Sequence, residues 1–429
     1  MLAIPIGIIG CGTVGTGVIK LLTKNAPDIS RKCGNELYIK KVLVKNLQKE
    51  RQVNLPPEIF TQNPEEILED PEIKIVVEVM GGIEPAKTYI LRALENGKNV
   101  VTANKDVLAA HGKELFHASQ NHNADLMFEA SVAGGIPVIM PLKESLAGNK
   151  IQQVLGIING TTNYILTKMS NEGMEFSEAL AQAQSLGYAE GDPTADIEGF
   201  DAARKIAILA SIAFQTRVIA KDVYVEGITN ISARDILYAR ELGFVIKLLG
   251  IAREIEDQID VRVHPVFLPT SHPLASVQDV FNAVFIEGDA VGQTMFYGPG
   301  AGEMPTASSV VGDLMAIARD IGLQVTGRIA PCTCYKNKTF RPIGETESCY
   351  YLRLIVKDEP GVLGSIAGIL GEKMVSLASV IQKRTLGKMA EIVLITHRVK
   401  ESNLHEALSA IKELATVKSI DNIIRVEGR

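Results

Sequence analysis

The chain has 429 residues, too many for one hydrophobic core, so we expect two or three domains. Hydrophobic residues make up 46% and charged residues 22%, as in ordinary globular proteins, and a net charge of -6 gives no basic surface for nucleic acid. The apolar stretches are too short to cross a bilayer, and five scattered cysteines do not make a disulfide framework, so we expect a cytoplasmic protein without membrane partners.

Short apolar runs alternate with helical patterns over residues 1–130, which predicts a Rossmann-type doubly wound parallel sheet of the α/β class. We expect strands at Ile4–Ile9, Ile39–Val44, Ile73–Val79, Asn99–Thr102 and Asp125–Glu129. Helices are expected at Pro85–Asn96 and Val107–His122.

A second α/β segment covers residues 131–300, with strands near Gln153–Ile158 and Val261–Phe267. A glycine-rich loop then feeds a helix, and we expect residues 301–325 to complete the first domain. Residues 326–348 lack periodicity and contain clustered Pro, Gly, Lys and Thr, which indicates a linker.

The pattern changes again over residues 349–429. The expected elements are strand Tyr350–Val356, helix Val362–Gly371, strands Val375–Gln382 and Ala390–Thr396, helix Asn403–Leu414 and strand Ile420–Val426. Their order, β-α-β-β-α-β, is that of a split βαβ domain.

The first expected strand runs directly into the G-x-G-x-x-G motif Gly10-Cys11-Gly12-Thr13-Val14-Gly15. A helical pattern follows the motif, which is the context of a dinucleotide-binding fingerprint. Backbone N–H groups at the start of that helix would receive the pyrophosphate. The alternative is a glycine-rich turn without a ligand.

Two lysines lie where a cofactor would be bound. Lys45 follows the second strand at the position where NAD-binding sites usually carry an acid, which favours NADP over NAD. Lys105 follows the strand Asn99–Thr102 and therefore points toward the cofactor crevice. Each lysine has a simpler interpretation as a solvated surface residue.

The stretch Ala181–Phe214 combines a loop rich in acids with a helix that starts near Asp201. Asp201 and Lys205 are four residues apart and share one face of that helix. Carboxylate neighbours and partial burial both act on the proton affinity of such a lysine. An ordinary helix ion pair beside a solvated acidic loop is the alternative.

This stretch resembles the signature of the homoserine dehydrogenase family. The matching positions are Ala183, Gly187-Tyr188-Ala189, Asp192-Pro193, Asp196-Ile197, Gly199, Asp201 and Lys205. Similar matches occur at Val76–Gly82, Thr102–Lys105, Glu129–Pro137, Ile158–Leu166 and Gly298–Leu314. The resemblance covers essentially the whole chain, including a C-terminal ACT domain at 349–429, and makes 131–300 the catalytic and dimerisation domain.

The resemblance implies reversible NAD(P)H-dependent reduction of L-aspartate 4-semialdehyde to L-homoserine, in threonine, methionine and isoleucine biosynthesis. It makes Lys205 the proton donor, Glu190 and Asp201 substrate ligands, and Lys105 a contact of cofactor and substrate. It also places Gly187 and Gly302 beside the nicotinamide nucleotide. A monovalent cation, sodium or potassium, would be held by the carboxylate of Glu129 and the carbonyls of Val132, Gly134 and Ile136.

For the ACT domain, the hypothesis is feedback inhibition by threonine. Asp358, Gly361 and Val362 form the turn into its first helix, where the helix N-terminus would receive a carboxylate. The alternative is a purely oligomerising domain, and we expect a homodimer or homotetramer in either case.

Two other functions compete with this one. Aspartate-semialdehyde dehydrogenase acts on the same aldehyde but needs a catalytic cysteine, and no cysteine lies between Cys33 and Cys332. A non-catalytic sensor would join a nucleotide-binding domain to a ligand-binding module. The intact Asp201–Lys205 pair and the acidic loop argue against such a sensor.

Overall fold

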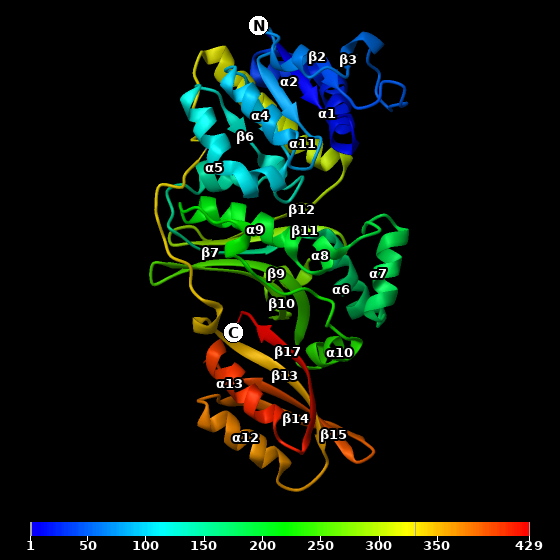
Figure 1. Ribbon diagram of the computed structural model, residues 1–429, viewed down its shortest axis with the longest axis vertical. Coiled ribbons are helices and arrows are strands. Elements are labelled where there is room, and N and C mark those ends of the chain that lie inside the picture. The colour runs from blue at the N-terminus through cyan, green and yellow to red at the C-terminus, as the bar shows by residue number, and fades with distance from the viewer. Residues whose placement is uncertain (1, 331, 429) are drawn as a thin grey trace. The chain divides into compact units, whose positions relative to one another are not determined.

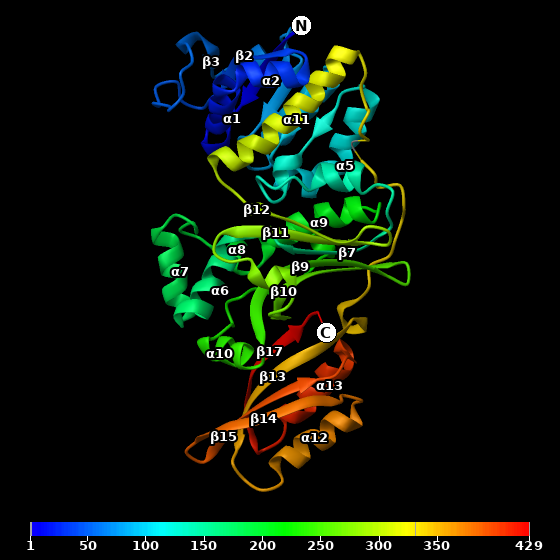
Figure 2. The same cartoon turned by 180° about the vertical axis from the view of Figure 1, so that it is seen from behind.

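The computed structural model describes residues 2–330 and 332–428, which divide into two compact units. The first unit contains the chain up to Asn159, Ala203–Val223 and Phe281–Asn337. The second contains Gly160–Ala202, Tyr224–Val280 and the chain from Lys338 onward. Each unit is therefore assembled from three separate stretches of the chain, as the colours of Figure 1 and the reverse view in Figure 2 show.

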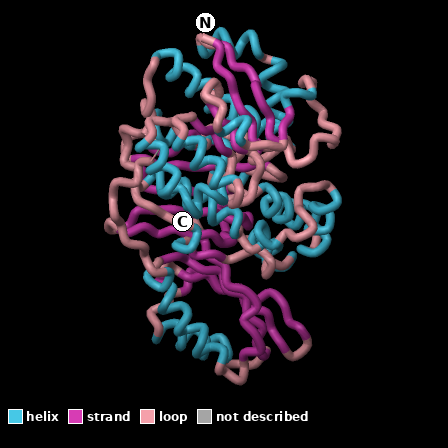
Figure 3. The backbone as a smooth tube through the Cα atoms, turned by 45° about the horizontal axis from the view of Figure 1, so that its top comes forward, coloured by secondary structure: helices cyan, strands magenta, loops and turns pink. Residues whose placement is uncertain are grey.

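A six-stranded parallel sheet organises the first unit, in the order β3-β2-β1-β4-β5-β6. The strands are β1 (Ala3–Ile9), β2 (Glu36–Leu43), β3 (Phe60–Thr61), β4 (Ile75–Glu78), β5 (Asn99–Thr102) and β6 (Leu126–Met127). The accompanying helices, cyan in Figure 3, are α1 (Thr13–Lys24), α2 (Ala26–Cys33), α3 (Glu65–Leu68), α4 (Ala86–Glu95), α5 (Lys105–Asn121) and α11 (Glu303–Leu323). The strand order reverses between β1 and β4, which is the point where such sheets bind ligands. The predicted Rossmann-type sheet is confirmed.

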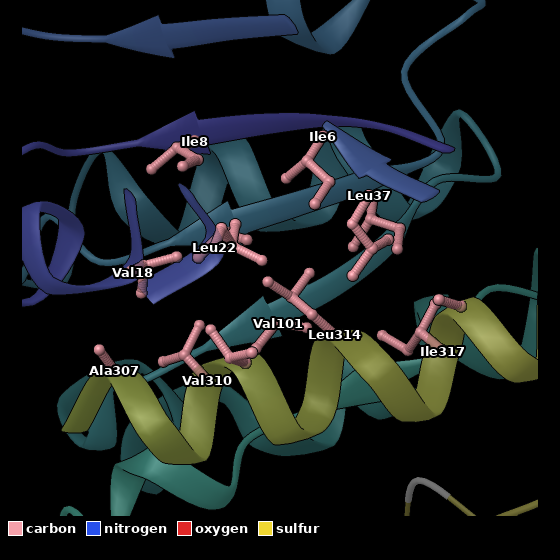
Figure 4. Packing of buried hydrophobic residues seen from close by; sticks show 14 of the residues in the cluster. Ile6, Ile8, Val18, Leu22, Leu37, Val101, Ala307, Val310, Leu314 and Ile317 are labelled. Atoms are coloured by element: carbon pink, nitrogen blue, oxygen red, sulfur yellow. The ribbon is translucent and has the colours of Figure 1, made fainter. Parts of the chain in front are cut away.

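Helix α11 closes the core of this sheet although it comes from far along the chain. Its buried side chains Ala307, Val310, Leu314 and Ile317 belong to the same cluster as Ile6, Ile8, Val18 and Val101 (Figure 4). At the crossing of α1 and α11, a Cβ on Gly17 would lie 2.4 Å from the carbonyl oxygen of Glu303. Only glycine therefore allows this close approach, and an ion pair of 2.7 Å between Lys20 and Glu303 accompanies it.

The rest of the first unit contains three antiparallel strands in the order β12-β11-β7. They are β7 (Ile151–Ile157), β11 (Phe281–Gly288) and β12 (Gly292–Pro299). Helix α9 (Phe200–Ala213) begins in the second unit and continues in the first from Ala203. A 3-10 turn at Glu129–Ser131 and a π-helical turn at Pro141–Ser145 complete the segment after β6.

The second unit contains a sheet in the order β9-β10-β17-β13-β15-β14. Its long hairpin consists of β9 (Phe244–Ile255) and β10 (Gln258–Pro269), and the short β8 (Tyr224–Val225) pairs with β10. The helices outside the C-terminal module are α6 (Gly160–Glu172), α7 (Phe176–Ser185), α8 (Thr194–Ile197) and α10 (Ala233–Glu241). No helix among the described residues is long and apolar enough to cross a membrane.

The C-terminal module has the predicted β-α-β-β-α-β order, which confirms an ACT-type fold. Its elements are β13 (Glu347–Lys357), α12 (Val362–Glu372), β14 (Leu377–Leu386), β15 (Met389–Thr396), α13 (Glu401–Lys412) and β17 (Val417–Val426), with a short β16 (Val399–Lys400) added. Leu352 and Leu354 of β13 pack in one buried cluster with residues of α12 and α13. On the same strand, Arg353 donates from Nε to the carboxylate of Asp235 on α10, at 2.8 Å.

The predicted bounds of several elements differ from those in the structure, and two of these differences have a clear local cause. The strand expected at Asp125–Glu129 is only Leu126–Met127, because the chain turns into the 3-10 turn at Glu129. The helix expected from Val107 already begins at Lys105, because the side chain of Asn104 accepts a hydrogen bond from the Val107 N–H and caps the helix.

Candidate active site

The glycine motif forms the turn between β1 and α1. A Cβ on Gly10, whose φ is +104°, would lie 2.9 Å from the backbone of Met80, and one on Gly15 would lie 2.2 Å from the Gly10 carbonyl oxygen. These two glycines allow the tight packing of the turn. At Gly12, by contrast, no described atom lies within 4 Å of a built Cβ, and no side chain caps the helix. The N–H groups at Thr13 and Val14 therefore begin a helix with an open anion-binding position, which suits the pyrophosphate of a dinucleotide.

The segment that follows β2 carries three cations, Lys45, Lys49 and Arg51, of which the first and the last concern the candidate site. Lys45 is exposed and lies two residues beyond Leu43, where β2 ends one residue earlier than predicted. Arg51 returns to the same region, donating from Nη2 to the carbonyl of Asn46 at 2.6 Å and packing over the ring of Phe60. Within the described residues, the buried Nε of Arg51 has no hydrogen-bond acceptor. The sequence analysis missed Arg51, because Arg51 is far from the strand end in sequence and comes close to it only when the loop folds back.

The carboxyl ends of β4 and β5 are joined through a buried carboxyl group. Glu78 accepts a hydrogen bond from the hydroxyl of Thr102 at 2.7 Å, and burial raises the pKa of Glu78. Asn104, which follows β5, donates to the carbonyl of Gly82 at 2.7 Å. These bonds fix the start of α5, so Lys105 occupies the first turn of a helix at the carboxyl edge of the sheet.

Lys205 lies on α9 and is half-buried. Its ammonium donates to the carbonyl of Ile158, just after the end of β7, at 2.8 Å. One turn earlier on the same helix, Asp201 is buried. Next to Lys205, Arg204 forms an ion pair of 3.3 Å with Asp106, the second residue of α5. This ion pair links the two helices that carry Lys205 and Lys105.

The acidic loop between α7 and α8 belongs to the second unit. Gly187 has a φ of +75° and ends the turn after α7, where the N–H groups of the next two residues bond to the carbonyl of Ala183. Gln184 donates to the backbone carbonyl of Glu190 at 3.2 Å, and Glu190 itself is exposed. Glu190 and Gly187 thus share one loop, while Lys105 and Lys205 belong to the first unit.

Glu129 is buried in the segment after β6. Its carboxylate accepts three backbone hydrogen bonds, from the N–H groups of Val138 at 2.6 Å, Ile139 at 2.8 Å and Met140 at 2.7 Å. Burial raises the pKa of this carboxyl overall, although the three backbone hydrogen bonds act to lower it. The carboxylate is therefore fixed at a defined position.

The loop that follows Glu129 is buried at Val132 and Ile136. A Cβ on Gly134, whose φ is +51°, would lie 2.3 Å from the carbonyl oxygen of Gly300, so this loop packs tightly on the one leading to Gly302. Gly302 has a φ of +130° and precedes the first residue of α11. One carboxylate and several backbone carbonyls in one buried loop are the oxygen ligands that a hard cation prefers.

In the ACT-type module, the turn from β13 to α12 has the predicted form. Gly361 adopts a left-handed conformation with a φ of +89°, and the helix starts at Val362 without a side-chain cap. The N–H of Asp358 bonds to the carbonyl of Lys388 at 3.0 Å, and Gln382 donates to its carboxylate at 3.3 Å.

Comparison with known families covers most of the chain. A family model described as "Homoserine dehydrogenase, NAD binding domain" matches residues 10–129, one described as "Homoserine dehydrogenase" matches 137–315, and an ACT domain model matches 350–416. The homoserine dehydrogenase of Bacillus subtilis is 44% identical over 430 residues, which cover 100% of this chain and 99% of that protein.

Solved structures agree with these matches. A homoserine dehydrogenase from Thiobacillus denitrificans superposes with a TM-score of 0.94 at 43% identity, covering 99% of this chain and 98% of that one. A hyperthermophilic archaeal homoserine dehydrogenase mutant in complex with NADPH superposes with a TM-score of 0.64 at 28% identity, covering 76% of this chain and 100% of that one.

Proposed function

Because this chain belongs to the homoserine dehydrogenase family, we propose that Lys205 is the proton donor when L-aspartate 4-semialdehyde is reduced to L-homoserine. When bound, the nicotinamide cofactor supplies the hydride. The Lys205 ammonium then stabilises the charge that develops on the carbonyl oxygen and protonates it. The observation that carries this role is the bond of 2.8 Å to Ile158, which orients a half-buried ammonium at the end of β7.

The other proposed contacts divide between binding and orientation. Glu190 and Asp201 hold the substrate, whose α-ammonium is attracted by carboxylates. Lys105 contacts both cofactor and substrate, and Gly187 and Gly302 lie beside the nicotinamide. In this proposal, residues 1–130 with 301–325 bind the dinucleotide, 131–300 bind the substrate, and 349–429, joined by the linker 326–348, are regulatory.

For the cofactor, the proposal favours NADP over NAD. Lys45 and Arg51 follow β2, and a 2′-phosphate is recognised by such cations while a 2′-hydroxyl is usually held by an acid. The unsatisfied buried Nε of Arg51 supports an anionic partner at this position. The archaeal relative bound to NADPH supports the same choice.

A sodium or potassium ion is proposed for the buried loop after β6. The fixed carboxylate of Glu129 and the carbonyls of Val132, Gly134 and Ile136 would hold it, and its charge would offset that of the buried carboxylate. A cation here would also hold this loop against the one that ends at Gly302, since the two loops already touch at Gly134.

We propose threonine as the effector of the ACT module, consistent with a role in threonine, methionine and isoleucine biosynthesis. The uncapped start of α12 at Gly361 and Val362 offers N–H groups to its carboxylate, and Asp358 lies in the same turn to receive its ammonium. The five cysteines are free thiols, which suits the proposed cytoplasmic location.

A homodimer or homotetramer is proposed for the assembly. Strands β11 and β12 expose Phe281, Met295 and Tyr297, at 37%, 40% and 53% of their surfaces, and the rings of Phe281 and Tyr297 stack at 5.2 Å. Aromatic and methionine side chains are enriched in subunit interfaces, so this sheet face suits a second copy of the chain.

A steady-state assay of the full chain tests the proposed function. We expect oxidation of NADPH on addition of aspartate semialdehyde, with a higher kcat/KM than NADH gives. Absence of turnover with either cofactor would refute the catalytic proposal. Equal kcat/KM values would leave the reaction intact and refute only the proposed preference for NADP.

A further inference from the structure

Two cysteines that the proposed reaction does not use lie together in the segment between α11 and β13. The backbone N–H of Cys334 donates to the sulfur of Cys332 at 3.3 Å, and the Cys334 thiol contacts the carbonyl oxygen of Ser211 at 3.9 Å. Both cysteines are half-buried and line one cavity of the first unit. The two cysteines therefore lie next to each other and face one cavity.

Positive charge surrounds this pair. Arg217 lines the same cavity, and Lys143 reaches the adjoining chain by donating to the carbonyl of Ala330 at 3.0 Å. The side chain and the backbone N–H of Cys334, together with these two cations, lower the pKa of the Cys332 thiol to about 6. The side-chain contact with Cys332, together with burial, raises the pKa of Cys334. The two sulfurs are thus unequal, with Cys332 the better thiolate.

We propose that Cys332 and Cys334 form a reversible dithiol–disulfide site that exchanges with small disulfides such as glutathione disulfide. The Cys332 thiolate attacks one sulfur of glutathione disulfide, and the first glutathione leaves as a thiolate that takes up a proton. Cys334 then loses its thiol proton and attacks the Cys332 sulfur, which releases the second glutathione. Two cysteine thiols are oxidised, and one glutathione disulfide is reduced to two glutathione molecules.

The cavity also connects the pair to the helices of the candidate active site. Leu108 of α5 and Ser211 of α9 both line it, and Arg217 donates to the carbonyl of Leu108 at 3.4 Å. Closing the disulfide removes the thiol proton that Cys334 directs at Ser211, six residues after Lys205 on α9. We therefore expect oxidation to lower kcat. This kinetic effect rests on the proposed role of Lys205, whereas formation of the disulfide does not.

The experiment equilibrates the full chain in glutathione buffers of increasing oxidation, alkylates the remaining thiols and digests with trypsin. The tryptic peptide 329–336 contains both cysteines and no others. We expect this peptide to escape alkylation and to lose two hydrogen atoms, while dithiothreitol restores two alkylated cysteines. Complete alkylation of both cysteines after equilibration with glutathione disulfide would overturn the proposal.

Matched variants identify the role of each sulfur. Cys334→Ser should stop at a glutathione adduct on Cys332, Cys332→Ser should form no bridge, and Cys349→Ser, which alters another half-buried cysteine, should behave as the wild type. If the wild type keeps as much glutathione adduct as Cys334→Ser does, then Cys334 does not displace glutathione from Cys332, and this part of the proposal is overturned. Oxidation should lower kcat in the wild type and not in Cys332→Ser. An unchanged kcat in a wild-type sample shown to carry the bridge would overturn the regulatory effect.

Discussion

Replacing Lys205 by alanine should abolish turnover while leaving the fold and cofactor binding intact. The change removes the ammonium and with it the bond to the Ile158 carbonyl, at 2.8 Å. Alanine is the best helix former, so α9 should persist, and its buried residues such as Ile206 and Leu209 are untouched. The glycine turn at Gly12 is also unchanged.

The magnitude follows from what the ammonium does. A hydrogen bond to a charged group contributes about 1.5–3 kcal/mol to stability, and less here because Lys205 is half-buried. Loss of a general acid lowers the rate about 10²–10⁴-fold. At about 1.36 kcal/mol for each factor of ten, the barrier rises by about 2.7–5.4 kcal/mol. The expected loss of rate is therefore much larger than any loss of folded protein would explain.

The assay compares kcat with the dissociation constant of NADPH, measured by its fluorescence. Lys168→Ala is the matched control. Lys168 lies on α6 and forms an ion pair of 2.6 Å with Glu172 on the same helix. We expect wild-type kcat in the control. A Lys205→Ala enzyme that keeps more than about a tenth of kcat would refute the general-acid role. Equal losses of NADPH affinity and of kcat would instead indicate a disturbed cofactor site.

Three further predictions concern other parts of the chain. Lys45→Ala and Arg51→Ala should each raise KM for NADPH and leave KM for NADH unchanged; equal effects on both cofactors would remove these cations from the phosphate site. Threonine should release heat on titration into the full chain but not into Asp358→Ala, whose turnover should persist, and equal heats would move the effector elsewhere. Burial alone would raise the pKa of Asp235, but the hydrogen bonds from Arg353 and its neighbours lower it overall. The resulting stability is complete above pH about 4 and is lost as the pH falls through the lowered pKa. Asp235→Asn should therefore cost about 3–5 kcal/mol at pH 7 and less in acid, in urea unfolding followed at both pH values, and a cost independent of pH would contradict this.

The dinucleotide-binding fold could be predicted because each of its strands and turns is marked by residues adjacent in the sequence. Each strand of the parallel sheet is a short apolar run that ends at a turn, and β5 (Asn99–Thr102) was predicted to the residue. The β-α-β-β-α-β module could be predicted equally well, since apolar residues recur at different spacings in its helices and in its strands. The long hairpin of β9 and β10 was harder, because its strands are buried on both faces and their apolar runs do not alternate.

The contacts of the candidate site could not be read in this way, because they join distant parts of the chain. Lys205 was singled out by its neighbours in sequence, but its bond to Ile158 spans 47 positions. Arg51 returns to Asn46 only because the loop after β2 folds back. Cys332 and Cys334 were counted as scattered thiols, and their cavity exists only once α5 and α9 are packed.

The late position of α11 has a consequence for how the protein is made. The sheet from β1 to β6 is complete at Met127, but the helix that covers its residues Ile6 and Ile8 begins at Glu303. At about 5–20 residues per second, the ribosome needs roughly 9–35 seconds to add the intervening chain. Throughout that time α1 and α2 cover part of this apolar face, but the part that packs on α11 is open to chaperones or to other nascent chains. A shortened chain that stops before Glu303 would keep that part exposed, so cutting the sequence after its last parallel strand would leave the core of the nucleotide-binding domain incomplete.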